Sequence, residues 1–396
     1  MSEIHIGIDA TRVGSRRRGI DNFTYHLLAN LPSALEELPN AIVTAYVSAS
    51  AQSMLRAQLP SSYRLRLSPV RDGHPVVREQ LLLPSRIARD GIRFDIFHSP
   101  GYPAPLWAPA KRRVITVHDV VFRSHPETMT KDRWYWRLFF PGIANRADLI
   151  LTDSSFSAAE LWHYYPRTRA RPLKVLPMGI GENFVNASTF GYEADRIRAR
   201  HHLPPDYIVW IGAIQPRKNL PFMIEVLAHF YRRYPKWSGL KLVLVGAKAW
   251  KYQTILSAVA ERGLGSNVMF LGHIDDHDLV PVLSGARAFV FPSLHEGFGI
   301  PVLEAMACGV PVLAARAGAL PEVVGDAGLL LPLGDAHPWI AALNLILGDP
   351  TTAESMRLKG LERSKRYTWR LCAQRVVQTY IELLAAAGKT NDREPN

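Results

Sequence analysis

Residues 291–315 read FPSLHEGFGIPVLEAMACGVPVLAA. An apolar strand ends at Phe291, and a glycine-bearing loop follows it. Pro301 fits the first turn of a helix, where its missing N–H costs nothing, and Gly309 is placed to end that helix. A second apolar strand begins at Val312. The stretch therefore predicts a strand, a loop, a helix and a strand in succession, which is the repeating unit of a parallel α/β sheet.

The same unit recurs along the chain on both sides of this stretch. Apolar runs of strand length occupy 4–9, 95–98, 114–117 and 149–152 in the first half, and 207–212, 242–245, 268–271, 288–291 and 312–315 in the second. From Met178 to about Pro205 the pattern weakens and glycine and proline gather, which is typical of a hinge. We expect two doubly wound α/β domains, 1–190 and 205–366, with ligand sites at the carboxyl ends of their strands.

Composition excludes several classes of protein. The chain has 396 residues, 47% of them hydrophobic, which excludes disorder throughout, and its two cysteines exclude a disulfide scaffold and a cysteine-rich zinc module. The first residues lack the apolar run of a signal peptide, and no window has the roughly 18 apolar residues of a membrane span, so we expect a cytoplasmic protein. Residues 1–190 hold 24 basic and 16 acidic residues, an excess that suits nucleic acid, an anionic membrane or a phosphorylated substrate.

Two glutamates in the opening stretch are candidate ligand-binding residues. Glu296 lies in the glycine-bearing loop, and we place Glu304 in the first turn of the helix, close to Glu296 in space. A glycine-rich loop that opens a helix presents backbone N–H groups to an anion, and carboxylates beside it accept hydrogen bonds from the hydroxyls of a ribose or a sugar. In the alternative, Glu296 caps the helix and Glu304 is an exposed acid.

A second candidate segment is GAIQPRKNL, residues 212–220. It follows a predicted strand; Gly212 permits close approach of the backbone, and Asn219 is placed to cap the next helix. Arg217 and Lys218 at a helix entrance offer a diphosphate a bidentate fork and a point charge. The alternative is a solvated basic turn.

These two segments give the chain its resemblance to a known family. HEGFGIPVLEAMACGVPV (295–312) together with GAIQPRKNL is similar to the retaining, GT-B-fold glycosyltransferases of family 4, in particular mannosyltransferases of bacterial surface-polysaccharide assembly. Weaker matches follow in order over nearly the whole chain: the glycine loop 14–19 with Ile20, TVHDVV (116–121), LTDSSFSA (151–158) and PEVVGDAGLLLPLGD (321–335). The fold implied is two Rossmann-like domains facing a central cleft, with a helix at about 367–386 that returns to the N-terminal domain. Residues 387–396 look like a flexible tail.

The resemblance also implies roles for individual residues. Glu304 would bind the nucleotide ribose, and Glu296 the donor sugar and its β-phosphate. Arg217 and Lys218 would neutralise the diphosphate, and His118 would face the sugar. The backbone would supply further donor contacts at Gly19, Gly212, Gly297, Phe298, Gly299 and Ile300. The N-terminal domain would bind the acceptor and the C-terminal domain the nucleotide sugar.

The implied reaction keeps the anomeric configuration and needs no metal or other cofactor. The segment most similar to a metal-binding motif is Asp275-Asp276-His277-Asp278. Its position after a predicted strand favours a helix N-terminus instead. Retention through a covalent intermediate would require a carboxylate about 3 Å from the anomeric carbon, and Glu296 is the only candidate. We favour front-face attack, in which the diphosphate oxygen takes the proton of the acceptor.

His118 and the aromatic segment 131–141 each have a structural alternative. His118, followed by Asp119 at a strand end, is also typical of a structural hydrogen-bonded pair, and His98 is a weaker candidate near the acceptor. The segment KDRWYWRLFFP mixes aromatic and basic residues, as membrane-interface segments do, and Arg16–Arg18, Arg167, Arg169 and Arg171 add positive charge. In the alternative, Trp134 and Leu138 pack in the domain core. The membrane hypothesis places the enzyme on the inner face of the plasma membrane, where it reaches a lipid-linked glycan.

Other functions fit the sequence less well. A phosphorylase needs a lysine for pyridoxal phosphate, and a nicotinamide dehydrogenase needs G-x-G-x-x-G after the first strand, which Gly14-x4-Gly19 does not match. No nucleic-acid-binding pattern occurs. We expect GDP-mannose as the donor and a lipid-linked glycan or oligosaccharide as the acceptor. A UDP-sugar donor and a nucleotide-sugar epimerase of the same fold stay open.

Overall fold

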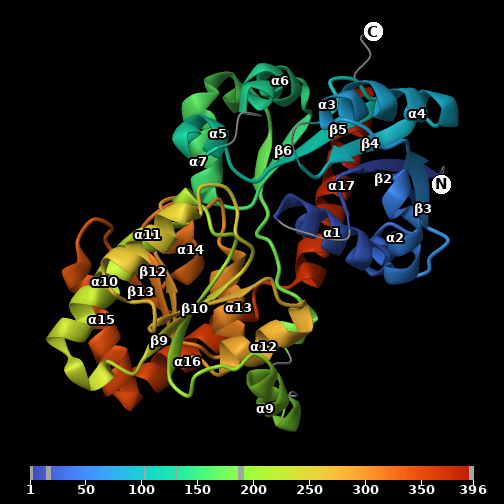
Figure 1. Ribbon diagram of the computed structural model, residues 1–396. Coiled ribbons are helices and arrows are strands. Elements are labelled where there is room, and N and C mark those ends of the chain that lie inside the picture. The colour runs from blue at the N-terminus through green and yellow to red at the C-terminus, as the bar shows by residue number, and fades with distance from the viewer. Residues whose placement is uncertain (1–2, 15–18, 102–103, 130–132, 186–190, 392–396) are drawn as a thin grey trace. The chain divides into compact units, whose positions relative to one another are not determined.

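The computed structural model describes residues 3–14, 19–101, 104–129, 133–185 and 191–391, with side chains omitted at 20, 133, 185, 191–192 and 387–391 (Figure 1). The chain divides into two compact units. The first combines Met1–Gly179 with Trp369–Asn396, and the second is Ile180–Thr368. Each unit has its own parallel sheet covered by helices, so the predicted α/β class is confirmed.

The first unit is built on a seven-stranded parallel sheet in the order β3-β2-β1-β4-β5-β6-β7. Its strands are β1 (Ile4–Ala10), β2 (Ala41–Ser48), β3 (Leu65–Val70), β4 (Phe94–Ser99), β5 (Ala110–Val117), β6 (Leu149–Thr152) and β7 (Leu173–Val175). Its helices are α1 (Ile20–Ala34), α2 (Gln52–Gln58), α3 (Pro75–Val77), α4 (Leu83–Asp90), α5 (Val121–Ser124), α6 (Arg133–Arg146), α7 (Ser155–Tyr164) and α17 (Trp369–Asn391), and a π-helical turn, η3 (Arg78–Leu82), joins α3 to α4.

Helix α17 belongs to the first unit although it comes last in the chain. It packs against α1, and its buried face includes Cys372, Val376 and Tyr380. The Tyr380 hydroxyl lies 2.6 Å from Nδ1 of His98 in β4. The predicted return of the final helix to the N-terminal domain is therefore confirmed. The helix continues through Asn391, past its predicted end at 386, and residues 392–396 of the expected tail lie outside the described residues.

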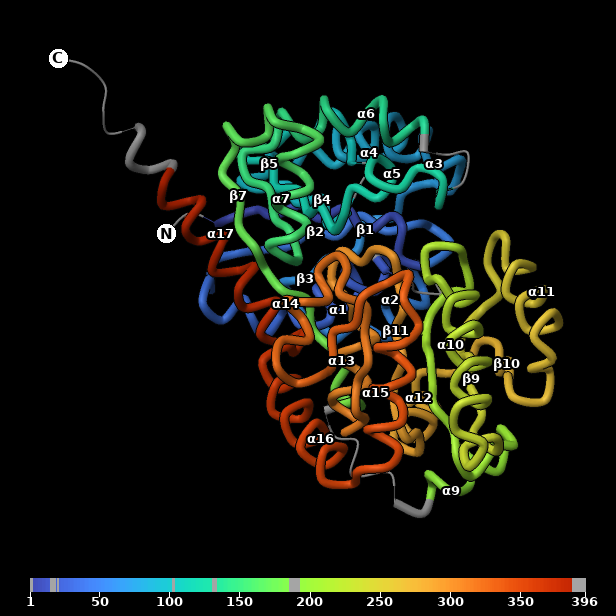
Figure 2. Tube along the Cα trace, turned by 90° about the vertical axis from the view of Figure 1, so that its left-hand side faces the viewer, coloured from blue at the N-terminus to red at the C-terminus, as the bar shows by residue number. Residues whose placement is uncertain are grey.

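The second unit is built on a six-stranded parallel sheet in the order β10-β9-β8-β11-β12-β13. Its strands are β8 (Tyr207–Ile211), β9 (Lys241–Val245), β10 (Val268–Gly272), β11 (Ala288–Phe291), β12 (Val312–Ala315) and β13 (Leu329–Leu331). Its helices are α8 (Glu182–Val185), α9 (Gly191–Arg200), α10 (Leu220–Arg233), α11 (Gln253–Glu261), α12 (Asp276–Ser284), α13 (Ile300–Ala307), α14 (Leu320–Val324), α15 (Ala336–Gly348) and α16 (Pro350–Ser364). Figure 2 follows the Cα trace through α9 to α16.

The predicted hinge, 178–205, contains regular structure. Helices α8 and α9 lie in this range, and both pack against α12 of the second unit. The boundary between the units falls at its start, between Gly179 and Ile180. The pattern looked weak because α9 is short and rich in charge, so its apolar face is limited to a few residues such as the buried Ile197.

Each sheet has one point at which the strand order reverses. In the first sheet β1 leads outward to β2 and β3, whereas β4 begins the series on the other side, so the reversal lies between β1 and β4. In the second sheet it lies between β8 and β11. In doubly wound folds the two loops at such a point leave in opposite directions, and ligands bind there at the carboxyl ends of the strands.

Candidate functional site

Three charged side chains meet at the strand reversal of the second sheet. Arg217 and Lys218 belong to a 3₁₀ turn, η7 (Pro216–Lys218), which follows β8, and Glu296 lies in the loop that follows β11. Arg217 Nη1 lies 3.0 Å from Glu296 Oε2, and Lys218 Nζ lies 2.6 Å from Glu296 Oε1. The solvated basic turn is therefore excluded, because both cations are bound to a carboxylate.

The cluster is buried, and its charges are strongly coupled. Burial alone would raise the pKa of Glu296, but the Arg217 and Lys218 charges lower it to about 2. Lys218 is itself buried, with Nζ 4.9 Å from the centre of the Phe291 ring, so the cation lies over an aromatic face. Arg217 also donates to the carbonyl oxygen of His295. The group carries one net positive charge at neutral pH.

Two close approaches of the backbone fix the Glu296 loop. The Ala319 N–H donates to the carbonyl oxygen of Glu296 at 2.9 Å. At Gly318 the φ angle is +59°, and a Cβ there would lie 2.5 Å from that same oxygen, so only glycine fits. Gly299 has a φ of +112°, and a Cβ there would lie 2.8 Å from Cδ2 of the Leu320 side chain. Gly318 was missed from the sequence, because a glycine alone gives no signal of the segment that it contacts.

Helix α13 begins directly after the glycine loop, and Glu304 lies on it. Its N-cap is Gly299, so Glu296 does not cap it, and Pro301 lies at its N-terminus as predicted. Glu304 is the fifth residue of the helix; its predicted place in the first turn is wrong by one position, because the helix begins at Ile300. Gly309 ends the helix as predicted, with a φ of +70°, and its N–H donates to the Met306 carbonyl oxygen.

The Glu304 carboxyl group is in an unusual state. It is half-buried, and among the described residues it makes no hydrogen bond or ion pair. Burial, together with the Asp276 carboxylate, raises its pKa to about 8. A carboxyl group with unused acceptor oxygens on the helix that follows the glycine loop is suited to a ligand that brings hydroxyl donors.

The other predicted donor-site residues lie along the same loops. Gly212 directly follows β8 and has a φ of +151°, and a Cβ on the neighbouring Gly246 would overlap its carbonyl oxygen at 1.8 Å. Asn219 occupies the N-cap of α10, but it adopts a left-handed conformation and its side chain makes no capping bond. Gly297 and Ile300 are half-buried, and Phe298 is buried with its ring 5.9 Å from that of Tyr367.

The acidic run 275–278 forms the N-terminus of α12, as predicted. Asp275 is the N-cap residue and Asp276 begins the helix. Asp278 is engaged by basic groups, since its carboxylate lies 3.1 Å from Arg200 Nη1 and 2.7 Å from His201 Nε2. The run is therefore part of the packing of α12 against α9.

His118 forms a buried pair in the first unit. Its Nδ1 lies 2.6 Å from the Asp153 carboxylate and its Nε2 lies 2.8 Å from the Pro100 carbonyl oxygen. Burial alone would lower its pKa, but the Asp153 carboxylate raises it. The partner is Asp153 and not Asp119, which accepts from the N–H of Val121. Both ring nitrogens are used inside the unit.

Two further predictions concern the first unit. His98 lies inside β4 and not in a loop, and it is buried between Tyr380 and Thr116, with its pKa lowered to about 3 by burial and by the His118 charge. Gly19 is the exposed N-cap of α1, with a φ of +51°. Arg16–Arg18, predicted as a basic cluster, lie outside the described residues.

Residues 133–141 of the segment 131–141 form the first part of α6. Tyr135 and Phe140 are buried, so part of the helix does pack in the core. Trp134 and Leu138, however, are 59% and 66% exposed, so the alternative that placed these two residues in the core is wrong. Their spacing puts them on the face opposite to the one that Phe140 buries. Lys131 and Asp132 lie outside the described residues.

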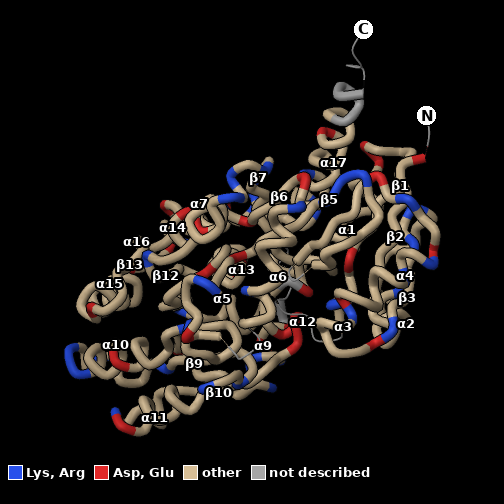
Figure 3. The backbone as a smooth tube through the Cα atoms, turned by 90° about the horizontal axis from the view of Figure 1, so that it is seen from above, with Lys and Arg blue, Asp and Glu red and all other residues tan. Residues whose placement is uncertain are grey.

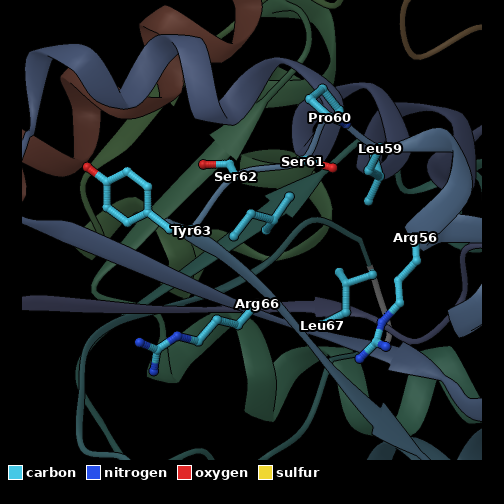
Figure 4. A pocket seen from close by; sticks show the side chains of 9 residues that line it. Arg56, Leu59, Pro60, Ser61, Ser62, Tyr63, Arg66 and Leu67 are labelled. Atoms are coloured by element: carbon cyan, nitrogen blue, oxygen red, sulfur yellow. The ribbon is translucent and has the colours of Figure 1, made fainter.

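An open hollow of about 600 Å³ lies elsewhere in the first unit, along the edge strand β3 (Figure 4). It is lined by Arg56, Tyr63, Arg66 and the apolar side chains of Leu59, Leu65 and Leu67. These residues belong to the amino-terminal half of β3 and the segment before it, whereas sites in parallel sheets form at the carboxyl ends. The hollow is therefore not the candidate site.

The chain is similar to known proteins over nearly its whole length. Residues 193–363 match the family model described as Glycosyl transferases group 1, and residues 23–183 match Glycosyltransferase Family 4. O-antigen chain mannosyltransferase B of Escherichia coli is 31% identical over 91% of this chain and 95% of its own length. Serotype-specific mannosyltransferase WbdA of Escherichia coli is 28% identical over 76% of this chain, which spans only 37% of that protein. The solved structure of Anabaena Alr3699/HepE in complex with UDP and glucose superposes with a TM-score of 0.72 at 18% identity, over 96% of this chain and all of the other.

The two parallel sheets and these matches together define a glycosyltransferase of the GT-B fold. The chain belongs to glycosyltransferase family 4. Over the described residues, none of the helices is both long enough and apolar enough to cross a bilayer.

Proposed function

We propose that the chain is a retaining glycosyltransferase that moves mannose from GDP-mannose to a hydroxyl of a lipid-linked or oligosaccharide acceptor in surface-polysaccharide assembly. The observation that carries this proposal is the Arg217–Lys218–Glu296 cluster at the strand reversal of the second sheet. The choice of mannose rests on the likeness to the two Escherichia coli mannosyltransferases.

In this proposal the donor binds along the loops that follow β8 and β11. The diphosphate lies against Arg217, Lys218 and the N-terminus of α13, where the backbone of Gly297, Phe298, Gly299 and Ile300 offers N–H groups. Glu296 binds hydroxyls of the donor sugar, and the unpaired carboxyl of Glu304 binds those of the ribose. Gly212 lets the nucleotide approach the backbone after β8.

The cluster supplies the main catalytic effect. When the anomeric C–O bond breaks, negative charge moves onto the diphosphate, and Arg217 and Lys218 are already oriented to receive it because Glu296 holds them. Loss of one such preorganised contact typically costs about 100- to 1000-fold in rate. The acceptor hydroxyl attacks the same face that the leaving group departs from, and its proton passes to a diphosphate oxygen. No bound metal takes part in this proposed route.

His118 has a positioning role in this proposal. Its imidazole connects Asp153 to the Pro100 carbonyl oxygen at the carboxyl end of β4, so it fixes that loop beside the strand reversal of the first sheet. A His118→Asn variant should therefore affect acceptor binding more than donor binding.

A donor panel tests the proposed function. Thermal shifts of the full chain are measured with GDP-mannose, UDP-glucose and ADP-glucose, followed by transfer assays with the donor that stabilises it most. We expect GDP-mannose to give the largest shift, and Arg217→Gln to abolish the shift. A larger shift with UDP-glucose would favour the alternative, a UDP-sugar donor, which agrees with the UDP in the HepE structure. No shift with any of the three would refute the donor site.

We further propose that the first unit binds anionic membranes through α6. Trp134 and Leu138 form an exposed apolar pair, and Arg137 lies between them on the same exposed side. The turn η5 (Pro166–Ala170) packs against α6 and carries the exposed Arg167 and Arg169. Figure 3 marks in blue the positions of Lys and Arg along the backbone. An aromatic and aliphatic pair surrounded by arginines is complementary to an anionic lipid surface.

Cosedimentation tests the membrane proposal. The full chain should pellet with phosphatidylglycerol vesicles at low salt and much less with neutral vesicles. The double variant Trp134→Ser, Leu138→Ser should lose this binding. Leu358→Ser, which removes an equally exposed leucine from α16 of the second unit, is the matched control and should bind as the unaltered chain does. Binding that survives the double variant would remove α6 as the contact.

A further inference from the structure

A second charged cluster lies at the strand reversal of the first sheet, which is the position that corresponds to the donor cluster of the second. Arg12 follows the carboxyl end of β1, where Asp9 is the last residue but one. Glu79 and Arg78 come from the π-helical turn η3, and Asp21 from the first turn of α1. The elements that supply Arg217 and Glu296 in the second unit likewise flank a strand reversal.

The interior of this cluster holds Arg12 in place. Glu79 has no exposed surface, and its Oε1 lies 3.2 Å from Arg12 Nη1. The Tyr135 hydroxyl donates to Glu79 Oε2 at 3.1 Å, so both carboxylate oxygens are used. Asp9 accepts from the N–H and the hydroxyl of Thr11, at 3.1 and 2.8 Å. About a third of the Arg12 side chain stays exposed, at 31%.

Two groups in the cluster have bonding capacity left over. Within the part of the chain that the structure describes, the Asp21 carboxylate makes no hydrogen bond or ion pair, although it is half-buried. Nε of Arg78 is buried and has no hydrogen-bond partner there. A π-helical turn is also rare in folded proteins and occurs frequently at functional sites. Free donors and acceptors at a strand reversal are features of a binding site rather than of core packing.

We infer that Arg12 and Asp21 bind the terminal sugar ring of the acceptor glycan, with Glu79 and Tyr135 as the residues that position Arg12. This inference rests on the proposed function, because it supplies the second substrate of the same reaction. Sugar hydroxyls both donate and accept, so one ring can donate to the Asp21 carboxylate and accept from the Arg12 fork. A phosphate bound to Arg12 would also lie close to the Asp21 carboxyl group, which would repel it when ionised. The site therefore favours a neutral sugar over a phosphate.

Binding of two probes to the full chain tests this assignment. The probes are octyl α-D-mannopyranoside and octyl phosphate, and their binding is measured by titration calorimetry with GDP and UDP titrated in parallel. We expect the mannoside to bind and the phosphate not to bind. Arg12→Gln and Asp21→Asn should each weaken mannoside binding about 10- to 100-fold, the loss expected for one hydrogen bond to a charged group. Nucleotide affinity should not change.

Further variants separate binding from structure. Glu36→Gln removes an exposed acid from the segment that follows α1 and should leave both affinities unchanged. Glu79→Gln should weaken mannoside binding. Arg12→Lys should bind the mannoside better than Arg12→Gln but more weakly than the unaltered chain, because lysine lacks the fork that Glu79 orients. The assignment fails if the unaltered chain does not bind the mannoside, if Arg12→Gln and Asp21→Asn bind it normally, or if octyl phosphate binds through Arg12. If neither GDP nor UDP binds, the proposed function fails instead.

Discussion

Glu304 is the residue whose protonation should control donor binding. Burial and the Asp276 charge raise its pKa to about 8, so at neutral pH it is mostly protonated. Ribose hydroxyls donate to a carboxylate and thereby favour its ionised form, which means that donor binding must release a proton below pH 8. Donor affinity should therefore rise about tenfold per pH unit from pH 6.5 to 7.5, then level off above pH 8.

Titration calorimetry of GDP binding in buffers of different ionisation enthalpy measures this proton release directly. Glu304→Gln cannot ionise, so its GDP affinity should be lower at pH 8.5 and should not rise across this pH range. Glu322→Gln, an acid in the first turn of α14, serves as the control. An affinity that does not depend on pH in the unaltered chain would contradict the ribose contact.

Glu296 stabilises the folded chain because its pKa is lowered, whereas the pKa of Glu304 is raised. Its pKa in the folded chain, about 2, is below the ordinary value of 4.5, so its contribution is fully present above pH 4.5 and is lost as the pH falls through 2. Glu296→Gln leaves Arg217 and Lys218 buried without a carboxylate, which typically costs about 3–5 kcal/mol. We expect the Tm to fall by about 10 °C at pH 7 and by less at pH 3.

Pyrophosphate should restore part of the stability that Glu296→Gln loses, because it supplies the missing negative charge. Glu354→Gln breaks a bidentate pair with Arg357 on the exposed face of α16, and as the control it should change the Tm little. Equal effects of the two substitutions, or equal losses at pH 7 and pH 3, would show that the Glu296 cluster contributes little to folding.

At the residue scale, the sequence was enough to identify residues that a local pattern indicates, but not the contacts that tertiary packing determines. Arg217, Lys218 and Glu296 were found because glycine and proline beside them place each group after a strand. The Glu296 salt bridges, the Asp153 partner of His118 and the cluster around Glu79 join segments far apart in sequence. No residue pattern within one segment contains that information.

At the scale of elements, the loop 316–319 fixes the position of Glu296. The effect of this contact can be distinguished from the cost of backbone strain by comparing two glycines with similar φ angles. Gly318 and Gly263 both have a positive φ, at +59° and +66°. A Cβ on Gly318 would lie 2.5 Å from the Glu296 carbonyl oxygen, whereas nothing lies within 4 Å of one on Gly263. Gly263→Ala should therefore cost only the strain of about 1 kcal/mol.

Gly318→Ala should lower the Tm several times more than Gly263→Ala and should also weaken GDP or UDP binding, because the two backbone segments must separate. Thermal unfolding and a nucleotide titration of both variants test this. Similar Tm losses in both, or normal nucleotide affinity in Gly318→Ala, would show that the contact at Gly318 does not hold the loop.

Three of the strands that the sequence missed, β3, β7 and β13, lie at the edges of their sheets, whereas the missed β2 is a buried strand between β1 and β3. β3, with the sequence LRLSPV, carries an arginine and a proline. β7 and β13 are edge strands of three residues each. Edge strands need fewer apolar residues, so their pattern is weak, whereas the buried central strands β1, β8 and β11 gave clear signals.

At the scale of the whole molecule, the alternating pattern was enough to predict two doubly wound sheets, but not the strand order. That order is what puts one reversal between β1 and β4 and the other between β8 and β11. The first unit combines two separate stretches of the chain, and this was predictable only through the family resemblance. The residues of α17 alone do not indicate which unit the helix packs against. Tyr380, 282 positions from His98, makes that connection.

Since each unit has its own sheet and core, we expect two calorimetric unfolding transitions that respond to different changes. Tyr380→Phe leaves Nδ1 of the buried His98 without its partner, which should cost about 1–3 kcal/mol and lower the transition of the first unit alone. If Arg217 and Lys218 bind diphosphate as proposed, pyrophosphate should raise only the other transition. Tyr63→Phe removes a hydroxyl from an exposed side chain of the first unit and should move neither. A single transition that shifts with both Tyr380→Phe and pyrophosphate would show instead that the two sheets unfold as one cooperative unit.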